Sequence, residues 1–168
     1  MNKNLILLGM MGVGKTTLGK IVAKRKSLKF VDTDMVIEAK NSMTIQEIFK
    51  KKGEEFFRME EKKEILKILD DKNCVIALGG GAFMDADVRK NIIKKGISIW
   101  LDLDIKFLVE RTKKNQNRPL LKNVNKEEKI KEIYFQRKNI YEQANHIISC
   151  NNLDKEDIVE KIIKIYDN

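Results

Sequence analysis

The sequence predicts an α/β protein, a three-layer α/β/α sandwich in which helices cover both faces of a five-stranded parallel sheet. Five short apolar runs recur along the chain, and segments with helical periodicity separate them. Strands that alternate with helices form parallel sheets. A length of 168 residues, with no linker or internal repeat, predicts a single domain over 1–168.

The expected strands are continuous apolar runs, which is typical of strands buried on both faces. They lie at 4–8 (NLILL), 29–32 (KFVD), 74–78 (CVIAL), 97–102 (ISIWLD) and 146–150 (HIISC). In sheets of this kind, ligands bind beyond the carboxyl ends of the strands. The residues that follow each run are therefore the first candidates for a functional site.

The expected helices fill the intervals between these runs. Helical periodicity covers 15–26, 35–40, 44–51, 54–71, 85–95, 104–114, 126–144 and 154–166. Thr44 and Glu47 have the spacing of a capping box, which marks the start of a helix. Lysines and glutamates stand side by side in several of these helices, as on solvated faces with paired charges.

The net charge of +9 points to an anionic partner, and the distribution of the charge narrows the choice. Six of the 34 basic residues are arginine, and the lysines are scattered beside glutamates. The chain has no compact basic block interleaved with aromatic residues, so we expect small anions and no nucleic acid as partners. The few arginines mark places where a planar, forked donor is needed.

Membrane spans and disulfides are not expected. The longest apolar run, Leu5 to Gly14, is shorter than the roughly 20 residues that cross a bilayer. Lys15 closes this run where a signal-peptide cleavage site would begin, so secretion is disfavoured. Cys74 and Cys150 lack C-x-x-C spacing and stand in apolar runs, which predicts reduced core thiols and a cytoplasmic location.

The stretch GMMGVGKT, 9–16, fits the pattern G-x-x-x-x-G-K-[ST] between a strand and a helix, which is the context of a P-loop. Its backbone N–H groups and the start of the helix hold phosphate oxygens. Lys15 is expected to reach the β- and γ-phosphates and Thr16 to ligate Mg²⁺. The residues expected to bind ATP here are Gly12, Val13, Gly14, Lys15, Thr16 and Thr17. This motif predicts a P-loop NTPase fold, and a GTPase, a motor and a small-molecule kinase remain possible at this point.

The second run ends in VDTD, which places Asp32 and Asp34 on the same side if the strand continues. Asp32 is expected to join Thr16 in the shell of Mg²⁺. Asp34 is expected to orient an acceptor hydroxyl or take its proton. The alternative is that these carboxylates only cap the following helix.

The third run ends in three glycines, Gly79, Gly80 and Gly81, where many P-loop proteins have a magnesium-binding aspartate. Three glycines allow a ligand to approach the backbone closely. The chain also lacks an N-K-x-D motif for reading guanine, and it is much smaller than a motor. A small-molecule phosphotransferase is therefore the favoured class.

A polar stretch at about 113–125 contains the only proline, Pro119, and is long for a connection in a compact domain. We interpret it as a mobile lid, with a plain surface loop as the alternative. Arg118 in this stretch is placed to swing onto the phosphoryl group in transfer. Arg58 and Arg137 offer forked donors to a carboxylate.

Taken together, the motifs resemble those of the shikimate kinase family from Leu5 to Tyr141. The matching stretches are GMMGVGKTTLGK, FVDTD, TIQEIFKKKGEEFFRMEE, IALGGGA, NRPLL and RKNIYEQA. The resemblance implies a fold like that of nucleoside monophosphate kinases, with ATP and Mg²⁺ as cofactors. It also implies transfer of the γ-phosphoryl group of ATP to the 3-hydroxyl of shikimate, with shikimate as partner. Nothing in the sequence demands a second subunit, so we expect a monomer.

The resemblance also implies roles for individual residues. Asp34 would bind shikimate hydroxyls and act as the base, within substrate-binding helices at about 34–61. Lys15 and Arg118 would stabilise transferred charge. The other residues implied to bind substrate are Arg58, Glu61, Gly79, Gly80, Gly81 and Arg137. Arg111 would lie against adenine, and Asn151 stands where an adenine-side loop is expected.

Two other functions stay open at this stage. The first is another small kinase, such as a gluconate kinase, whose acceptor is also an anionic polyol. The second is a catalytically silent P-loop protein with a regulatory role. Lys15, Asp34 and Arg118 argue against a silent protein, and the two arginines with the three glycines favour a cyclic acid over gluconate.

Overall fold

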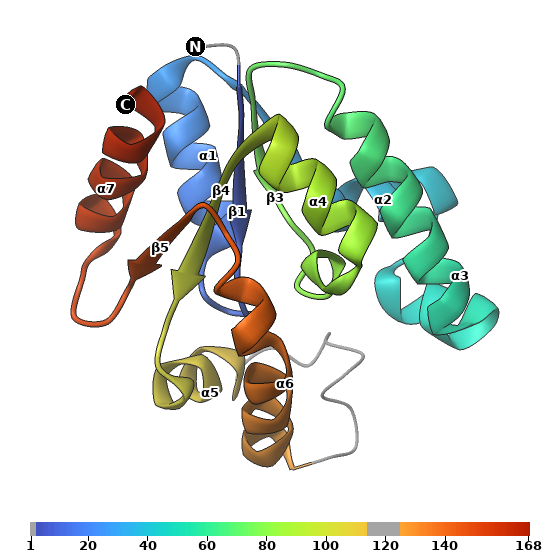
Figure 1. The fold of residues 1–168 in the computed structure, drawn as a ribbon. Coiled ribbons are helices and arrows are strands. Elements are labelled where there is room, and N and C mark those ends of the chain that lie inside the picture. Colours follow the sequence, from blue (N-terminus) through green and yellow to red (C-terminus); the bar gives the residue numbers. More distant parts are fainter. Residues whose placement is uncertain (1–2, 114–124) are drawn as a thin grey trace.

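The computed structural model describes residues 3–113 and 125–168, and its centre is a five-stranded parallel sheet (Figure 1). The strand order is β2-β3-β1-β4-β5. The strands are β1 (Asn4–Leu8), β2 (Lys29–Asp32), β3 (Cys74–Ala77), β4 (Gly96–Asp102) and β5 (His146–Ser149). All five expected strands are therefore confirmed, with bounds that differ by at most one residue.

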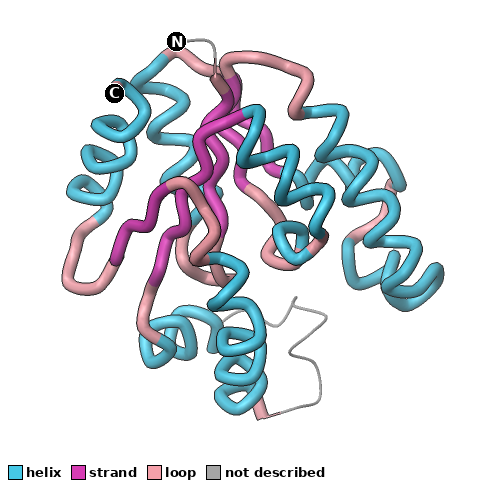
Figure 2. Tube along the Cα trace, in the orientation of Figure 1, coloured by secondary structure: helices cyan, strands magenta, loops and turns pink. Residues whose placement is uncertain are grey.

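Helices cover both faces of this sheet, so the expected three-layer sandwich is confirmed. The elements are α1 (Lys15–Lys26), α2 (Thr33–Asn41), α3 (Ile45–Ile68), the 3₁₀ turn η1 (Ala82–Met84), α4 (Ala86–Lys95), α5 (Ile105–Lys113), α6 (Lys126–Tyr141) and α7 (Lys155–Asp167). Helices α1 and α7 pack together on one face, and α4 lies on the other (Figures 1 and 2). The turn η1 had no counterpart among the expected helices.

The central strand β1 explains the apolar run at the start of the chain. Its five residues are all buried, and β3 and β4 pair with it on either side. Helices on both faces exclude water from its side chains, so every position is apolar or satisfied internally. Asn4 is the polar exception, and its amide donates to the carbonyl of Asp71 at 2.7 Å and accepts from the backbone of Cys74 at 3.1 Å.

Helices α2 and α3 form a second unit of packing at the β2 edge, around Ile37, Ile48 and Phe57. The two expected helices 44–51 and 54–71 are one element, α3, with an interruption at Gly53 (φ 85°, ψ 166°). The capping box of Thr44 and Glu47 is confirmed at its start. The expected break is therefore real, although the helix resumes at once.

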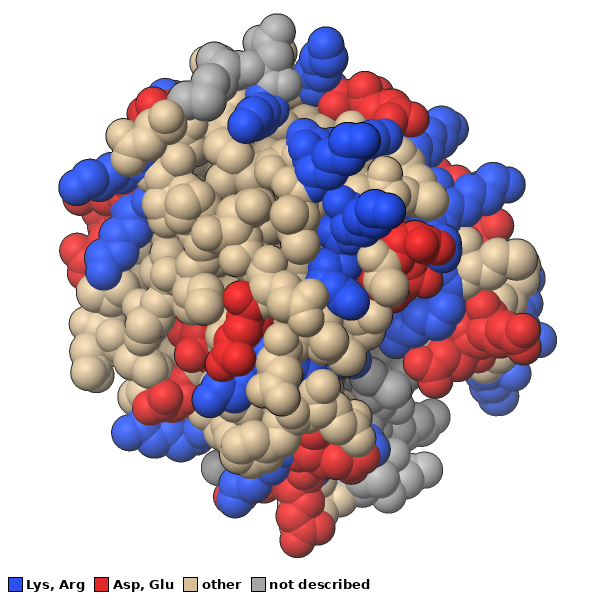
Figure 3. All heavy atoms as spheres, viewed as in Figure 1, with Lys and Arg blue, Asp and Glu red and all other residues tan. Residues whose placement is uncertain are grey.

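Most charged side chains lie on solvated faces, as the sequence predicts. Basic and acidic side chains lie beside one another over α3 on the face shown in Figure 3, and basic side chains predominate over α4. Lys62 of α3, for example, pairs with Asp85 at 3.2 Å and Asp87 at 2.6 Å. Within 3–113 and 125–168, no helix is both long and apolar enough to cross a membrane. Cys74 and Cys150 are buried free thiols, as expected.

The carboxyl ends of the strands all point to one end of the molecule, where the P-loop, η1, α5 and α6 gather (Figure 1). This arrangement places the loops after β1, β2 and β3 next to one another. Residues 114–124, which include Arg118 and most of the expected lid, lie outside the described residues.

Candidate active site

The P-loop after β1 has the backbone that its glycines predict. Gly9, Gly12 and Gly14 have φ values of 141°, 83° and 108°, in the range that favours glycine. Gly14 is the N-cap of α1, and the first turn of this helix contains no acidic residue. The amino group of Lys15 donates to the carbonyls of Gly9 at 2.8 Å and Met10 at 3.1 Å. The positive end of α1 and Lys15 together form an anion site.

Thr16 and Asp32 are in direct contact, as expected for residues that share a metal shell. The hydroxyl of Thr16 donates to Oδ2 of Asp32 at 2.7 Å. The other oxygen of Asp32 caps α2 by accepting from the backbone N–H groups of Asp34 and Met35. Asp32 thus joins the P-loop helix to the start of α2.

This pair fits Mg²⁺ bound together with a nucleotide. Mg²⁺ prefers hard oxygen ligands and is usually held by one or two protein groups plus phosphate oxygens and water. A hydroxyl and a carboxylate 2.7 Å apart provide such ligands. Among the described residues no cluster of three or more His, Cys, Asp or Glu side chains is placed to hold a metal by itself.

The condition under which Asp32 and Asp34 would share one side of a strand is not met, although both residues line the same cavity. The strand does not continue to Asp34, because β2 ends at Asp32 and α2 begins at Thr33. Asp34 lies in the first turn of this helix, which explains its position next to the cavity wall. The capping role considered for the pair belongs to Asp32.

One cavity of about 360 Å³ runs from the P-loop to the substrate-side residues. Its wall combines phosphate-binding, acidic, aromatic and arginine side chains. The lining residues are Met11, Gly12, Gly14, Lys15, Thr16, Thr17, Asp32, Asp34, Ile45, Phe49, Phe57, Arg58, Glu61, Ala77, Leu78, Gly80, Gly81 and Arg137. The cavity therefore unites the nucleotide-side and acceptor-side residues that the sequence predicts.

None of the three glycines after β3 has a positive φ, so their backbone angles do not require glycine. What requires glycine here is the space that neighbouring side chains occupy. A Cβ on Gly79 would lie 2.5 Å from Oε1 of Glu61 and 2.6 Å from Oδ1 of Asp34. A Cβ on Gly81 would lie 2.6 Å from a guanidinium nitrogen of Arg58. The absence of side chains here thus allows two carboxylates and one guanidinium to stand against the loop.

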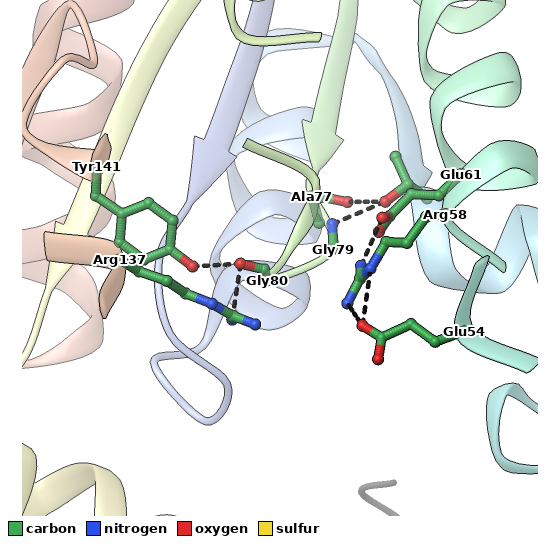
Figure 4. A network of polar contacts seen from close by, with 9 residues as sticks. Glu54, Arg58, Glu61, Ala77, Gly79, Gly80, Arg137 and Tyr141 are labelled. Atoms are coloured by element: carbon green, nitrogen blue, oxygen red, sulfur yellow. Dashed lines mark hydrogen bonds and ion pairs between the residues drawn. The ribbon is translucent and has the colours of Figure 1, made fainter. Parts of the chain in front are cut away.

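Arg58 and Glu61, both from α3, form the acidic and basic wall on one side of this loop (Figure 4). Nη1 of Arg58 pairs with Oε2 of Glu61 at 2.6 Å, and Nη2 pairs with Glu54 at 3.2 Å. The guanidinium also stands 5.1 Å from the ring centre of Phe57. Burial raises the pKa of the Glu61 carboxyl, and the charge of Arg58 opposes this shift.

Arg137 and Tyr141 of α6 approach the same loop from the opposite side (Figure 4). Nη1 of Arg137 donates to the carbonyl of Gly80 at 2.8 Å, and the hydroxyl of Tyr141 donates to the same oxygen. Two arginines from different helices therefore face one glycine loop. This is a geometry suited to holding a planar anion between them.

Some of the predicted residues stand apart from the cavity. Val13 and Gly79 are buried behind its wall. Arg111 donates from Nη1 to the carbonyl of Val13 at 3.3 Å, so it lies against the P-loop from α5. Asn151 follows β5, and its side chain binds both the backbone N–H (3.0 Å) and the carboxylate (2.9 Å) of Asp104. The adenine contacts of Arg111 and Asn151 stay predictions.

Sequence reasoning missed Thr33 as a part of the site. Its buried hydroxyl accepts from the backbone N–H of Gly79 at 2.8 Å and donates to the carbonyl of Ala77 at 3.4 Å. Thr33 thereby ties the start of α2 to the glycine loop. The signal was present in VDTD, because a polar residue between two functional aspartates needs a buried partner of its own.

The comparisons with known proteins agree with this geometry. The sequence profile described as "Shikimate kinase" matches residues 11–167. A shikimate kinase of Thermodesulfovibrio yellowstonii is 44% identical over 165 residues, which cover 98% of this chain and 95% of the relative. The solved structure "Shikimate kinase from Acinetobacter baumannii in complex with shikimate" has a TM-score of 0.94 and 34% identity, and covers 99% of this chain and 93% of that chain.

A gluconokinase structure from Sinorhizobium meliloti is also similar in fold, which bears on the rival considered above. Its TM-score is 0.65 at 11% identity, over 98% of this chain and 91% of that chain. At this level of identity the likeness shows a similar fold and carries no statement about function. The profile match and the 44% identity point to one family alone. With the P-loop, the arginine pair and the glycine loop gathered around one cavity, the chain belongs to the shikimate kinase family.

Proposed function

We propose that this enzyme transfers the γ-phosphoryl group of ATP to the 3-hydroxyl of shikimate, giving shikimate 3-phosphate and ADP. The observation that carries the proposal is the single cavity that joins the P-loop to Arg58 and Arg137. A phosphate donor and an anionic acceptor bound at its two ends would meet at Asp34. Shikimate is the ligand named for the similar structure from Acinetobacter baumannii.

At the acceptor end, the two arginines recognise the carboxylate of shikimate. They come from α3 and α6 and stand on opposite sides of the glycine loop (Figure 4). Arg58 is kept in place by Glu61 and Glu54, and Arg137 by the carbonyl of Gly80. A carboxylate placed between them would accept charge-assisted hydrogen bonds from two forks. Phe49 and Phe57 line the cavity beside Arg58 and give the cyclohexene ring an apolar wall.

At the donor end, the P-loop amides, Lys15 and the N-terminus of α1 hold the phosphates of ATP. Thr16 and Asp32 would hold Mg²⁺, which neutralises negative charge on the phosphates when bound. The amino group of Lys15 donates to the carbonyls of Gly9 and Met10, which places it beside the loop that would hold the phosphates. Arg118 would add positive charge from the expected lid.

Asp34 stands between the two ends and supplies the base. It accepts the proton of the 3-hydroxyl while the hydroxyl oxygen forms its bond to the γ-phosphorus, and the bond to the ADP oxygen breaks. Its place in the first turn of α2, capped by Asp32, fixes the carboxylate relative to the metal site. Positioning and charge neutralisation therefore supply most of the rate enhancement.

We also propose that the enzyme acts in the cytoplasm as a monomer in the pathway to chorismate and the aromatic amino acids. The buried free thiols support the cytoplasmic location. The mixture of basic and acidic side chains over α3 supports a small-molecule partner rather than a nucleic acid (Figure 3). Sedimentation of the purified chain tests the monomer.

The test of the function is ADP release from Mg-ATP with shikimate, with gluconate and with no acceptor. We expect release that depends on shikimate, with little release from gluconate or water. Release with gluconate alone would be consistent with the fold and the P-loop but would show that the assigned acceptor is wrong. Binding of ATP without release in any arm would favour the silent P-loop protein instead.

A further inference from the structure

The carbonyl of Gly80 is shared by two donors that come from one helix. Nη1 of Arg137 donates to it at 2.8 Å, and the hydroxyl of Tyr141 donates to the same oxygen (Figure 4). Arg137 and Tyr141 are four residues apart on α6, so their side chains lie on one face of the helix, a turn apart. A carbonyl oxygen has two lone pairs, and these two donors occupy them.

Tyr141 is fixed by its surroundings. It is 1% exposed, and its ring lies 5.8 Å from the ring centre of Trp100 and 6.5 Å from that of Phe83. Burial raises the pKa of its hydroxyl, which therefore stays protonated and remains a donor. The hydroxyl of Tyr141 is thus a fixed hydrogen-bond donor to the carbonyl of Gly80 in the glycine loop.

Gly80 itself has little means of keeping its own orientation. It has no side chain, and a Cβ at this position would lie 3.1 Å from Nη1 of Arg137. Gly79 and Gly81 have no side chain either. The orientation of the Gly80 carbonyl therefore depends on hydrogen bonds to the backbone. If the carbonyl of Gly80 rotated, Arg137 would lose its acceptor and the fork would turn with it.

We propose that Tyr141 is a positioning residue for the substrate carboxylate. Its hydroxyl fixes the carbonyl of Gly80, and this carbonyl fixes the fork of Arg137 that faces the cavity. The inference rests on the proposed role of Arg137 in binding the carboxylate of shikimate. Tyr141 does not line the cavity, so its action on the carboxylate would pass through Gly80 and Arg137.

The chain offers a matched control for Tyr141→Phe. Tyr166 of α7 is also buried, and its hydroxyl also donates to a backbone carbonyl, that of Lys3, at 3.3 Å. Tyr166→Phe therefore removes a similar hydrogen bond far from the cavity. Any loss of stability common to buried tyrosine hydroxyls is measured by this variant.

The experiment compares shikimate with its methyl ester, which lacks the carboxylate charge. We expect Tyr141→Phe to raise the KM for shikimate about tenfold, the range of one net hydrogen bond, with the KM for ATP unchanged. With the methyl ester, wild type and Tyr141→Phe should have the same kcat/KM, because neither can use the arginine fork. Tyr166→Phe should match wild type with both acceptors.

Three results would overturn the proposal. The first is an equal loss of kcat/KM on shikimate and on the ester, which would show that Tyr141 acts on something other than the carboxylate. The second is an unchanged KM for shikimate. The third is an unchanged KM for shikimate in Arg137→Lys, because this result would show that Arg137 does not bind the substrate carboxylate. Since shikimate-dependent ADP release is measured in wild type first, failure of the function itself is seen separately.

Discussion

Arg58 and Glu61 form a 2.6 Å ion pair beside the glycine loop, but the second oxygen of Glu61 has no hydrogen-bond donor among the described residues. This oxygen faces the same space next to Gly79 as Oδ1 of Asp34. Burial raises the pKa of Glu61, the charge of Arg58 lowers it, and the charge of Asp34 raises it further. The net shift is upward, so the folded protein holds the proton of Glu61 more tightly than the unfolded chain.

Glu61→Gln is predicted to change how stability depends on pH. Because the folded pKa is raised, the contribution of Glu61 is intact below the ordinary glutamate value and is lost as the pH rises through the folded value. The glutamine variant lacks this loss, so its stability relative to wild type should improve over that interval. Urea unfolding at a series of pH values measures this difference.

Glu55→Gln is the control for this experiment, since Glu55 is an exposed carboxylate on the same helix. This variant measures how far the change from glutamate to glutamine on the exposed face of α3 alters stability by itself. If the difference in stability between Glu61→Gln and wild type does not change with pH, Glu61 is ionised as readily in the folded chain as in the unfolded one, and the prediction is wrong.

Asp34→Asn is predicted to lower kcat by about 10²- to 10⁴-fold, the usual contribution of a general base, while ATP binding stays within about twofold. Asp87→Asn is the matched control. Asp87 is also the second residue of its helix, and Asp85 accepts its backbone N–H as Asp32 accepts that of Asp34. Steady-state kinetics and ATP titration provide both numbers. Equal losses in turnover and ATP affinity would count against the base.

Arg58→Lys is predicted to raise the KM for shikimate about 10- to 100-fold, because a forked contact to a carboxylate becomes a single one. The KM for ATP should not change. Arg25→Lys is the control, since Arg25 makes a forked contact with Glu156 on the surface between α1 and α7. Initial rates at varied shikimate separate the two variants, and an unchanged KM in Arg58→Lys would remove Arg58 from the clamp.

Gly79→Ala is predicted to lower kcat, because the new methyl group would overlap neighbouring side chains. Gly53→Ala is predicted to lower stability, because the backbone angles at this position are strained for alanine. The added methyl at Gly79 would meet Glu61 and Asp34 within 2.6 Å, so kcat should fall at least tenfold. Gly53 has no atom within 4 Å of a new Cβ, but its φ of 85° and ψ of 166° belong to glycine alone. That variant should lose about 1–3 kcal/mol of unfolding free energy with a smaller change in kcat. Thermal unfolding and kinetics on both proteins distinguish these effects, and the reverse pattern would refute the assignment.

Local patterns in the sequence predicted the fold well. The central strands β1, β3 and β4 are continuous apolar runs because helices cover both of their faces, and β1 shows this most completely. The edge strands β2 and β5 are more exposed. The P-loop has so specific a spacing that Lys15 and Thr16 were identified from the motif alone. Asp32 was paired with Thr16 because it ends the second expected strand, and the 2.7 Å contact confirms their proximity.

Contacts between distant parts of the chain could not be predicted in the same way. The three glycines suggested close approach of a ligand, whereas the structure shows that each also makes room for a protein side chain. The bond from Tyr141 to Gly80 spans 61 residues, and no local pattern records it. The sequence left open whether the strand continues to Asp34 or the carboxylates cap the next helix, and only the structure shows that Asp32 is the cap.

The most direct test of the central claim is the identity of the product, determined by ³¹P and ¹H nuclear magnetic resonance after incubation with Mg-ATP and shikimate. We predict one new phosphomonoester, on the 3-hydroxyl, formed in equal amount to ADP. A phosphate on another hydroxyl would show that Asp34 does not select the 3-hydroxyl. ADP formed without any phosphorylated shikimate would contradict the assignment of the acceptor.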